Sequence, residues 1–235
     1  MKYEIVTKNG TTHITVSYDY YGERIIDTIR FRVLQKPYEL RKYIEECGII
    51  GAQVLDIKLC FGTFHFRDFS LTCDIDELKE LNCESLPIEI ELDTPITIIT
   101  DKGTFELDFV DASTVFFTNS GLKFDRPAFP EIEDSIDITT LFSSIIGKKI
   151  VSYEIEEGKE HSFFTWSYGL ELDNNQVSYI WNLSLILEDG KRLHLYADFD
   201  WCVLKLLDKN REVIRVKTNE LLDEAQGGKN EQSSF

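Results

Sequence analysis

Apolar and polar residues alternate in short runs along much of the chain, and this pattern constrains the fold more than any other feature. Every second residue is apolar in Ile88–Leu92 and again in Phe105–Phe109. Successive side chains of a β-strand lie on opposite faces of a sheet, so this period of two indicates strands with one buried and one solvated face. Because antiparallel sheets tolerate one wet face, we expect an α+β protein that is mainly antiparallel β-sheet.

Two parts of the chain share one order of apolar residues and glycines. The segment Ile49–Gly51 recurs as Ile145–Gly147, and in both copies apolar residues follow three and six positions after the glycine. Further on, Ile96–Asp101 matches Ser184–Asp189, and a glycine follows within two residues in both, as a hairpin turn requires. The match continues after the turn, where Phe105, Leu107 and Val115 correspond to Leu193, Leu195 and Val203.

These matches predict an internal duplication of one β unit, with a helix, a strand, a variable middle, a hairpin and a closing strand. The alternative is that strand–turn–strand patterns resemble one another by chance, but two anchors in the same order and with the same apolar parity favour duplication. The shift between the copies changes from 96 to 88 residues. We assign the difference to an insertion in the second copy, in the polar stretch Glu156–His161.

Turn and capping residues predict the remaining elements. Asn9-Gly10 supplies the positive φ angles of a tight turn, so we expect an N-terminal hairpin, followed by a third strand over residues 24–33. Pro37 suits the first turn of a short helix, and Gly48 suits its end. Further short helices are expected over residues 74–81 and 139–146.

These expectations divide the chain into five parts. They are N-terminal strands over 1–36, a first β unit over 37–120, a linker with prolines and acidic residues over 121–137, a second β unit over 138–217 and a polar tail over 218–235. The two β units either pack into one composite domain or stand as two lobes.

The charge of the chain limits the partners that it can bind. With 42 acidic against 25 basic residues the net charge is −17, which repels phosphate backbones and anionic membranes. We therefore expect neither nucleic acid nor membrane among its partners. The first residues lack the apolar core of a signal peptide, and apolar neighbours around the cysteines favour buried free thiols, so we expect a cytoplasmic bacterial protein.

Familiar catalytic and cofactor-binding motifs are missing from the sequence. It contains no G-x-S-x-G, no G-x-G-x-x-G and no Walker loop, and its five cysteines lack the spacing of zinc ligands. We therefore favour a protein that is not an enzyme and that needs neither a cofactor nor a metal.

The segment Leu193–Trp201 has the most regular alternation in the chain. As one strand it would carry a polar face of His194, Tyr196, Asp198 and Asp200. The two aspartates would lie roughly 6.6 Å apart and could share a cation or act as an acid/base pair, although we favour a solvated strand face. Aromatic residues are dense before this segment, and the candidate binding residues among them are Trp166, Tyr168 and Trp181.

The acidic charge, the cytoplasmic character and the missing motifs favour a non-catalytic protein that binds another protein. The most specific form of this hypothesis is an acidic immunity protein that inhibits a basic bacterial toxin, since complementary charge accelerates such association. The rival hypothesis is an enzyme, or a small-ligand or metal-binding module, with its site on the second β unit. The sequence leaves the oligomeric state open.

Overall fold

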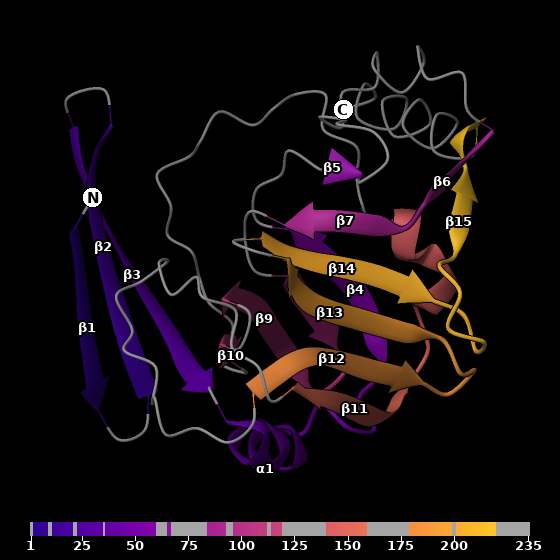
Figure 1. Cartoon of the computed structure of the whole chain (residues 1–235), viewed down its shortest axis with the longest axis horizontal. Coiled ribbons are helices and arrows are strands. Elements are labelled where there is room, and N and C mark those ends of the chain that lie inside the picture. The colour runs from indigo at the N-terminus through magenta and orange to yellow at the C-terminus, as the bar shows by residue number, and fades with distance from the viewer. Residues whose placement is uncertain are drawn as a thin grey trace, which may run out of the picture.

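The computed structural model is built mostly of two antiparallel β-sheets that pack face to face (Figure 1). They are accompanied by the helix α1 (Pro37–Cys47) and the 3₁₀ helix η1 (Thr140–Ile145). The structure describes residues 2–8, 11–20, 23–34, 36–59, 65–66, 84–92, 96–111, 114–118, 140–158, 179–198 and 201–219. The expected helix over 74–81, the linker over 121–137 and most of the tail lie outside these residues.

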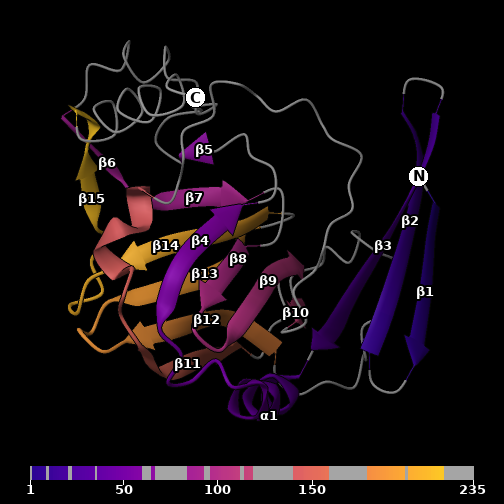
Figure 2. The same cartoon turned by 180° about the vertical axis from the view of Figure 1, so that it is seen from behind.

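The first sheet has seven strands in the order β1-β2-β3-β10-β9-β8-β4. Only the last residues of β3 pair with β10, so β1, β2 and the start of β3 extend away from the other strands, as both views show (Figure 1, Figure 2). The strands are β1 (Lys2–Lys8), β2 (Thr11–Tyr20), β3 (Glu23–Leu34), β4 (Val54–Leu59), β8 (Ile96–Thr100), β9 (Gly103–Asp111) and β10 (Thr114–Thr118).

The second sheet has six strands in the order β11-β12-β13-β14-β7-β5. Its last two strands, β7 and β5, come from the first half of the chain, and a separate two-stranded sheet joins β6 (Ser85–Pro87) to β15 (Arg215–Lys217). The six strands are β5 (His65–Phe66), β7 (Glu89–Leu92), β11 (Ile150–Gly158), β12 (Tyr179–Leu187), β13 (Arg192–Asp198) and β14 (Trp201–Leu207).

The inner faces of the two sheets enclose one hydrophobic core. The strand β9 contributes Phe105, Leu107 and Phe109, which are at most 1% exposed, and it contacts both β13 and β14 across the interface. Leu193 and Leu195 of β13 are fully buried in the same core. The alternation seen in β9 and β13 has its expected cause, because one face of each of these two strands is removed from water.

The helix α1 packs against this core and contacts β3 and β11. Pro37 opens its first turn, and the Glu39 carboxylate accepts a hydrogen bond from the backbone N–H of Lys36 at 3.4 Å. Gly48 follows the helix with a φ of 87°, a left-handed angle that glycine adopts at low cost. Both boundaries agree with those expected from the sequence.

Two groups of four strands have the same order. In the first sheet β4, β8, β9 and β10 are neighbours in the order in which the chain forms them, and in the second sheet β11, β12, β13 and β14 are. A β-bulge recurs at the start of each group, since the register skips Leu55 in β4 and Val151 in β11. These two residues are 96 positions apart in the sequence, and both are nearly half exposed.

The two groups meet where β4 and β11 begin, next to an isolated antiparallel bridge. Gly51 N donates to Ile150 O at 2.6 Å, and in the reciprocal position Gly147 N donates to Val54 O at 2.7 Å. The N–H groups of Ile150 and Val54 in turn donate across the junction, both at 2.9 Å. The two glycines have left-handed φ angles of 77° and 82°, so their conformation disfavours any residue with a side chain.

The expectation that Leu193–Trp201 forms one strand is wrong. The strand β13 ends at Asp198, and β14 begins at Trp201, which pairs with Asp198. The chain therefore reverses inside the segment, and Trp201 belongs to the neighbouring strand. By register Trp201 does not continue the row of Leu193 and Leu195, because the core residues Leu206 and Leu204 of β14 lie opposite these two leucines.

The expected insertion in the second copy is also wrong. Residues 150–158 form a single strand, and it is the first group that has the longer middle, with β5, β6 and β7 between β4 and β8. A shift that falls from 96 to 88 residues means a shorter second copy. The register also corrects the alignment of β8 with β12. Ile98 lies opposite Phe105, and Leu185 lies opposite Leu193. Corresponding positions of β8 and β12 are thus 87 residues apart, since the turn before β13 is one residue longer.

Candidate functional site

The outer face of the six-stranded sheet is lined by polar residues that the strand register brings into rows. Residues that lie directly opposite one another on antiparallel neighbours are close enough for their side chains to interact. One row crosses β11, β12, β13, β14 and β7 and consists of Glu154, Ser184, His194, Lys205 and Glu89. A second row contains Glu156, Asn182 and Tyr196.

His194 occupies the centre of this face. Its Nδ1 lies 2.8 Å from the Oγ of Ser184, and Ser184 is 5% exposed. Burial lowers the pKa of His194 below its ordinary value of 6.5, and the Lys205 ammonium lowers it further. The imidazole is therefore neutral at pH 7.

A serine next to a histidine is the arrangement of many nucleophilic pairs. Ser184, however, lies in the middle of β12, which is paired with a strand on both sides. The neighbouring backbone N–H groups belong to the sheet and are not free to stabilise an oxyanion. The contact with His194 is better explained as a hydrogen bond that satisfies two partly buried polar groups.

Ionic and aromatic contacts join β13, β14 and β7 on the same face. Lys205 Nζ lies 3.0 Å from Glu89 Oε1 and 5.0 Å from the centre of the Tyr196 ring. The Tyr196 hydroxyl donates to the same Glu89 oxygen at 3.3 Å. Glu89 thus balances the charge of Lys205, and the side chains of Lys205, Tyr196 and Glu89 contact one another.

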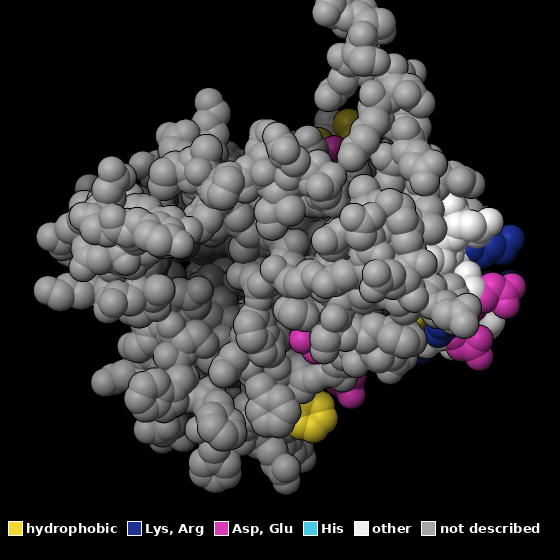
Figure 3. Space-filling model, turned by 90° about the horizontal axis from the view of Figure 1, so that it is seen from above, with side chains coloured by type: hydrophobic (Ala, Val, Ile, Leu, Met, Phe, Trp, Pro, Cys, Tyr) yellow, Lys and Arg dark blue, Asp and Glu magenta, His cyan; other side chains and the backbone are white. Residues whose placement is uncertain are grey.

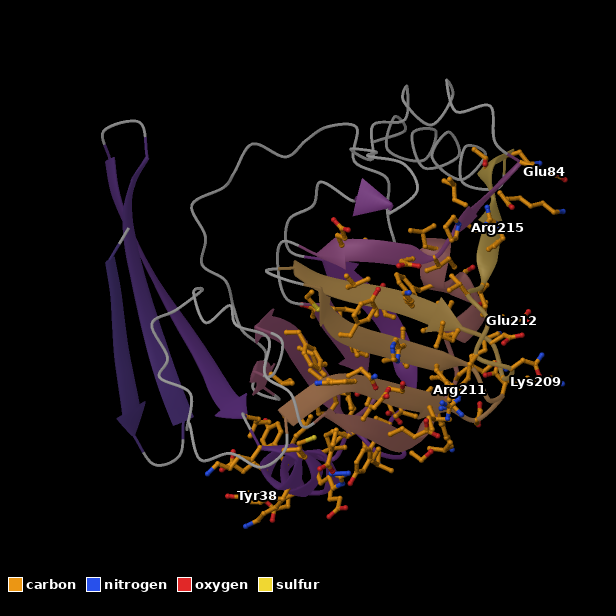
Figure 4. All side chains as sticks on the ribbon, in the orientation of Figure 1. Tyr38, Glu84, Lys209, Arg211, Glu212 and Arg215 are labelled. Atoms are coloured by element: carbon orange, nitrogen blue, oxygen red, sulfur yellow. The ribbon has the colours of Figure 1, made fainter. Side chains whose placement is uncertain are left out.

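Two arginines share one carboxylate at the β11 side of the face. Glu154 Oε2 lies 2.6 Å from Arg192 Nη1 and 3.0 Å from Arg211 Nη2. The Arg192 side chain is 15% exposed, whereas that of Arg211 is 65% exposed and comes from the turn after β14 (Figure 4). Glu154 therefore compensates the charge of a largely buried guanidinium, and its contact with Arg211 adds little.

Trp181 lies at the β11–β12 end of this face, at a second bulge. Asn182 lies opposite Glu156 and Ile180 lies opposite Glu157, so the register skips Trp181. Ile180 is fully buried, but Trp181 is 46% exposed. The bulge thus removes a tryptophan from the core and presents it at the surface.

The structure brings three of the residues predicted from the sequence onto one face, namely Trp181, His194 and Tyr196. Asp198 is the last residue of β13, and only its backbone is described. The other three predicted residues lie outside the described residues, and they are Trp166, Tyr168 and Asp200. The idea that Asp198 and Asp200 share a cation therefore stays a prediction.

Sequence reasoning missed the charged partners on this face. They are Glu89, Glu154, Arg192, Lys205 and Arg211. A signal existed, since residues 89 and 91 of β7 and residues 154 and 156 of β11 are polar positions in alternating runs. That signal identifies an outward face but not which strands are neighbours, so no pair could be named.

The side chains that the structure describes carry nearly balanced charges. Sixteen of them are acidic and thirteen are basic. Seen from above, acidic and basic groups lie next to each other along the coloured edge of the molecule (Figure 3). Most of the charge of −17 therefore comes from residues outside this set.

Among the described residues, no group of three or more His, Cys, Asp or Glu side chains is arranged to hold a metal ion. In the same part of the chain, none of the helices has the length and apolar character needed to cross a bilayer. Comparison with known proteins found no matching family model, no matching curated protein and no matching solved structure.

Proposed function

We propose that this protein is a non-catalytic, cytoplasmic binding protein whose partner is a basic protein. The observation that carries the proposal is the distribution of charge. The described side chains are close to neutral as a group, and several of their carboxylates are already paired with arginine or lysine. The excess of acidic over basic residues is therefore not required for the ion pairs of the two packed sheets.

The excess is concentrated in three stretches of sequence. Residues 67–83 hold five acidic and two basic side chains, and residues 119–139 hold the same numbers. Residues 220–235 hold four acidic side chains and one basic side chain. Acidic charge of this density attracts a basic protein over a Debye length of about 8 Å at physiological salt and accelerates the encounter.

The most specific form of the proposal is an immunity protein that blocks a basic bacterial toxin. Purified protein immobilised on beads should capture a basic protein from a bacterial extract, and calorimetry should show an affinity that falls between 50 and 500 mM salt by about tenfold or more. Capture of neutral or acidic proteins alone, or an affinity that does not respond to salt, would refute the proposal.

The rival function, a small-ligand or enzyme site on the second β unit, draws its support from the contact between Ser184 and His194. Thermal unfolding in the presence of divalent metals and of a metabolite panel tests it. A rise in melting temperature that is lost in His194→Gln would favour this rival over the binding protein.

We also propose that the two groups of four strands arose by duplication and that residues 1–36 form an N-terminal hairpin with a third strand. The support for duplication is the shared strand order, the bulges at Leu55 and Val151 and the reciprocal hydrogen bonds of Gly51 and Gly147. Because β7 of the first unit pairs with β14 of the second, we favour one composite domain over two lobes.

A further inference from the structure

The Trp181 indole lies directly on the backbone of Gly158. A Cβ atom added to Gly158 would be 1.9 Å from both Cε2 and Nε1 of the indole, so the ring occupies the space of the missing side chain. Gly158 is buried beneath the ring, while Trp181 remains 46% exposed. One side of the ring is therefore fixed by the main chain, and the exposed part is available to a ligand without further ordering.

Glu156 lies on the same strand as Gly158. It precedes Gly158 by two positions on β11, and the bulge belongs to β12, so both residues lie on the same face roughly 6.6 Å apart. The Asn182 side chain donates to Glu156 Oε2 at 2.6 Å and orients the carboxylate. Glu156 is exposed, and no cation of the described residues lies within ion-pair distance of it.

Glu154 differs from Glu156 in its partners. Glu154 lies on the same face of the same strand, and two arginines of the chain itself contact it. Glu156 has an amide partner instead, which positions it but leaves its charge in place. Glu156 is thus an exposed, oriented carboxylate without an ion-pair partner in the described part of the chain, two positions before the glycine that carries the indole. Such a carboxylate is suited to receive a cation from outside.

The chemistry of the pair selects among cations. Among the aromatic side chains, tryptophan binds cations over its ring most strongly. A guanidinium is planar, so it can stack on an indole while its N–H groups bind a carboxylate in the same plane. A lysine ammonium is a strongly hydrated point charge that matches this arrangement less well.

We infer that Trp181 and Glu156 form a cradle for an arginine side chain of the basic partner. The inference rests on the proposed function and locates one contact of that interface on the outer face of β11 and β12. Trp and Arg, together with Tyr, are also enriched among the residues that dominate binding energies at protein interfaces.

Hexa-arginine peptide is the probe that tests the cradle. The indole N–H signals of the ¹⁵N-labelled full chain are followed during titration, and the Trp181 signal is identified by its loss in Trp181→Phe. We expect a saturable shift of that signal, and in Glu156→Gln an affinity lower by about tenfold. Glu188→Gln is the matched control, because Glu188 is exposed at the other end of β12, and it should bind the peptide as the unmodified chain does.

Three results would overturn the cradle. The peptide fails to bind, or it binds without moving the Trp181 signal, or Glu156→Gln and Glu188→Gln weaken binding equally. The proposed function is judged separately, by capture of a basic protein with Trp181→Ala. Full capture by this variant would remove the cradle and keep the proposed function, whereas no capture by the unmodified chain would remove the proposed function itself.

Discussion

Gly158→Ala places a methyl group where the Trp181 indole lies. The added Cβ would meet the Cε2 and Nε1 atoms at 1.9 Å and the Cζ2 atom at 2.5 Å, and no real structure tolerates such distances. Gly158 is not among the glycines with a left-handed φ, so its backbone accepts alanine. The whole cost of the substitution must therefore come from moving the indole.

The magnitude follows from the area that the indole hides. A tryptophan buries about 200 Å² when it is fully packed, and Trp181 hides roughly half of its surface. Expelling it completely would expose about 100 Å², which costs about 2.5 kcal/mol at about 25 cal/mol per Å². A ring that only tilts loses less, so we expect Gly158→Ala to lower the free energy of unfolding by about 1–2.5 kcal/mol.

Urea unfolding monitored by circular dichroism measures this loss, and a double-mutant cycle assigns it. In a Trp181→Ala background the methyl group has nothing to displace, so Gly158→Ala should cost less than about 0.5 kcal/mol there. The reasoning is refuted if the alanine costs the same in both backgrounds, because the penalty would then come from the backbone and not from the ring.

Three further predictions concern the same sheet and the junction. Burial holds the pKa of His194 below 6.5, so the unfolded chain takes up that proton first as the pH falls. The free energy of unfolding should therefore decrease below about pH 6.5. In urea titrations between pH 7.5 and 5.5, the His194→Gln variant should lose less of this free energy than the unmodified chain. Glu154→Gln should destabilise by roughly 1–2 kcal/mol, since it leaves a largely buried arginine uncompensated, whereas Arg211→Ala should cost under about 0.5 kcal/mol; equal losses in thermal unfolding would contradict the assignment. Gly51→Ala and Gly147→Ala should each lower the free energy of unfolding by about 1 kcal/mol or more, because both glycines have left-handed φ angles. A loss near zero in urea unfolding would show that the backbone at that glycine can change its conformation without cost.

Local signals were sufficient where the structure depends on neighbours in sequence. Pro37 and Gly48 predicted both ends of α1, because a missing N–H and a left-handed angle act within one turn. Alternation predicted the buried faces of β9 and β13. The same local signal failed at Asp198, where it could not reveal that the chain reverses before Trp201.

The candidate site was predictable only in part for the same reason. His194 and Tyr196 were recognisable as an outward pair two positions apart, and Trp181 was recognisable as part of an aromatic cluster. That Trp181 leaves the core depends on a bulge, and a bulge is a property of two strands taken together. The contact between the Trp181 ring and Gly158 also depends on the pairing of β11 with β12.

The sequence by itself determined that the chain forms antiparallel strands with one wet face, where α1 begins and ends, and that the chain as a whole is strongly acidic. Only the tertiary structure decided which strands are neighbours. It places β7 beside β14 and so joins Glu89 to Lys205, two residues that are 116 positions apart in the sequence. The physical reason is that strand register is selected by burial of the whole face at once, so pairings between distant segments are decided when the two sheets close over their common core.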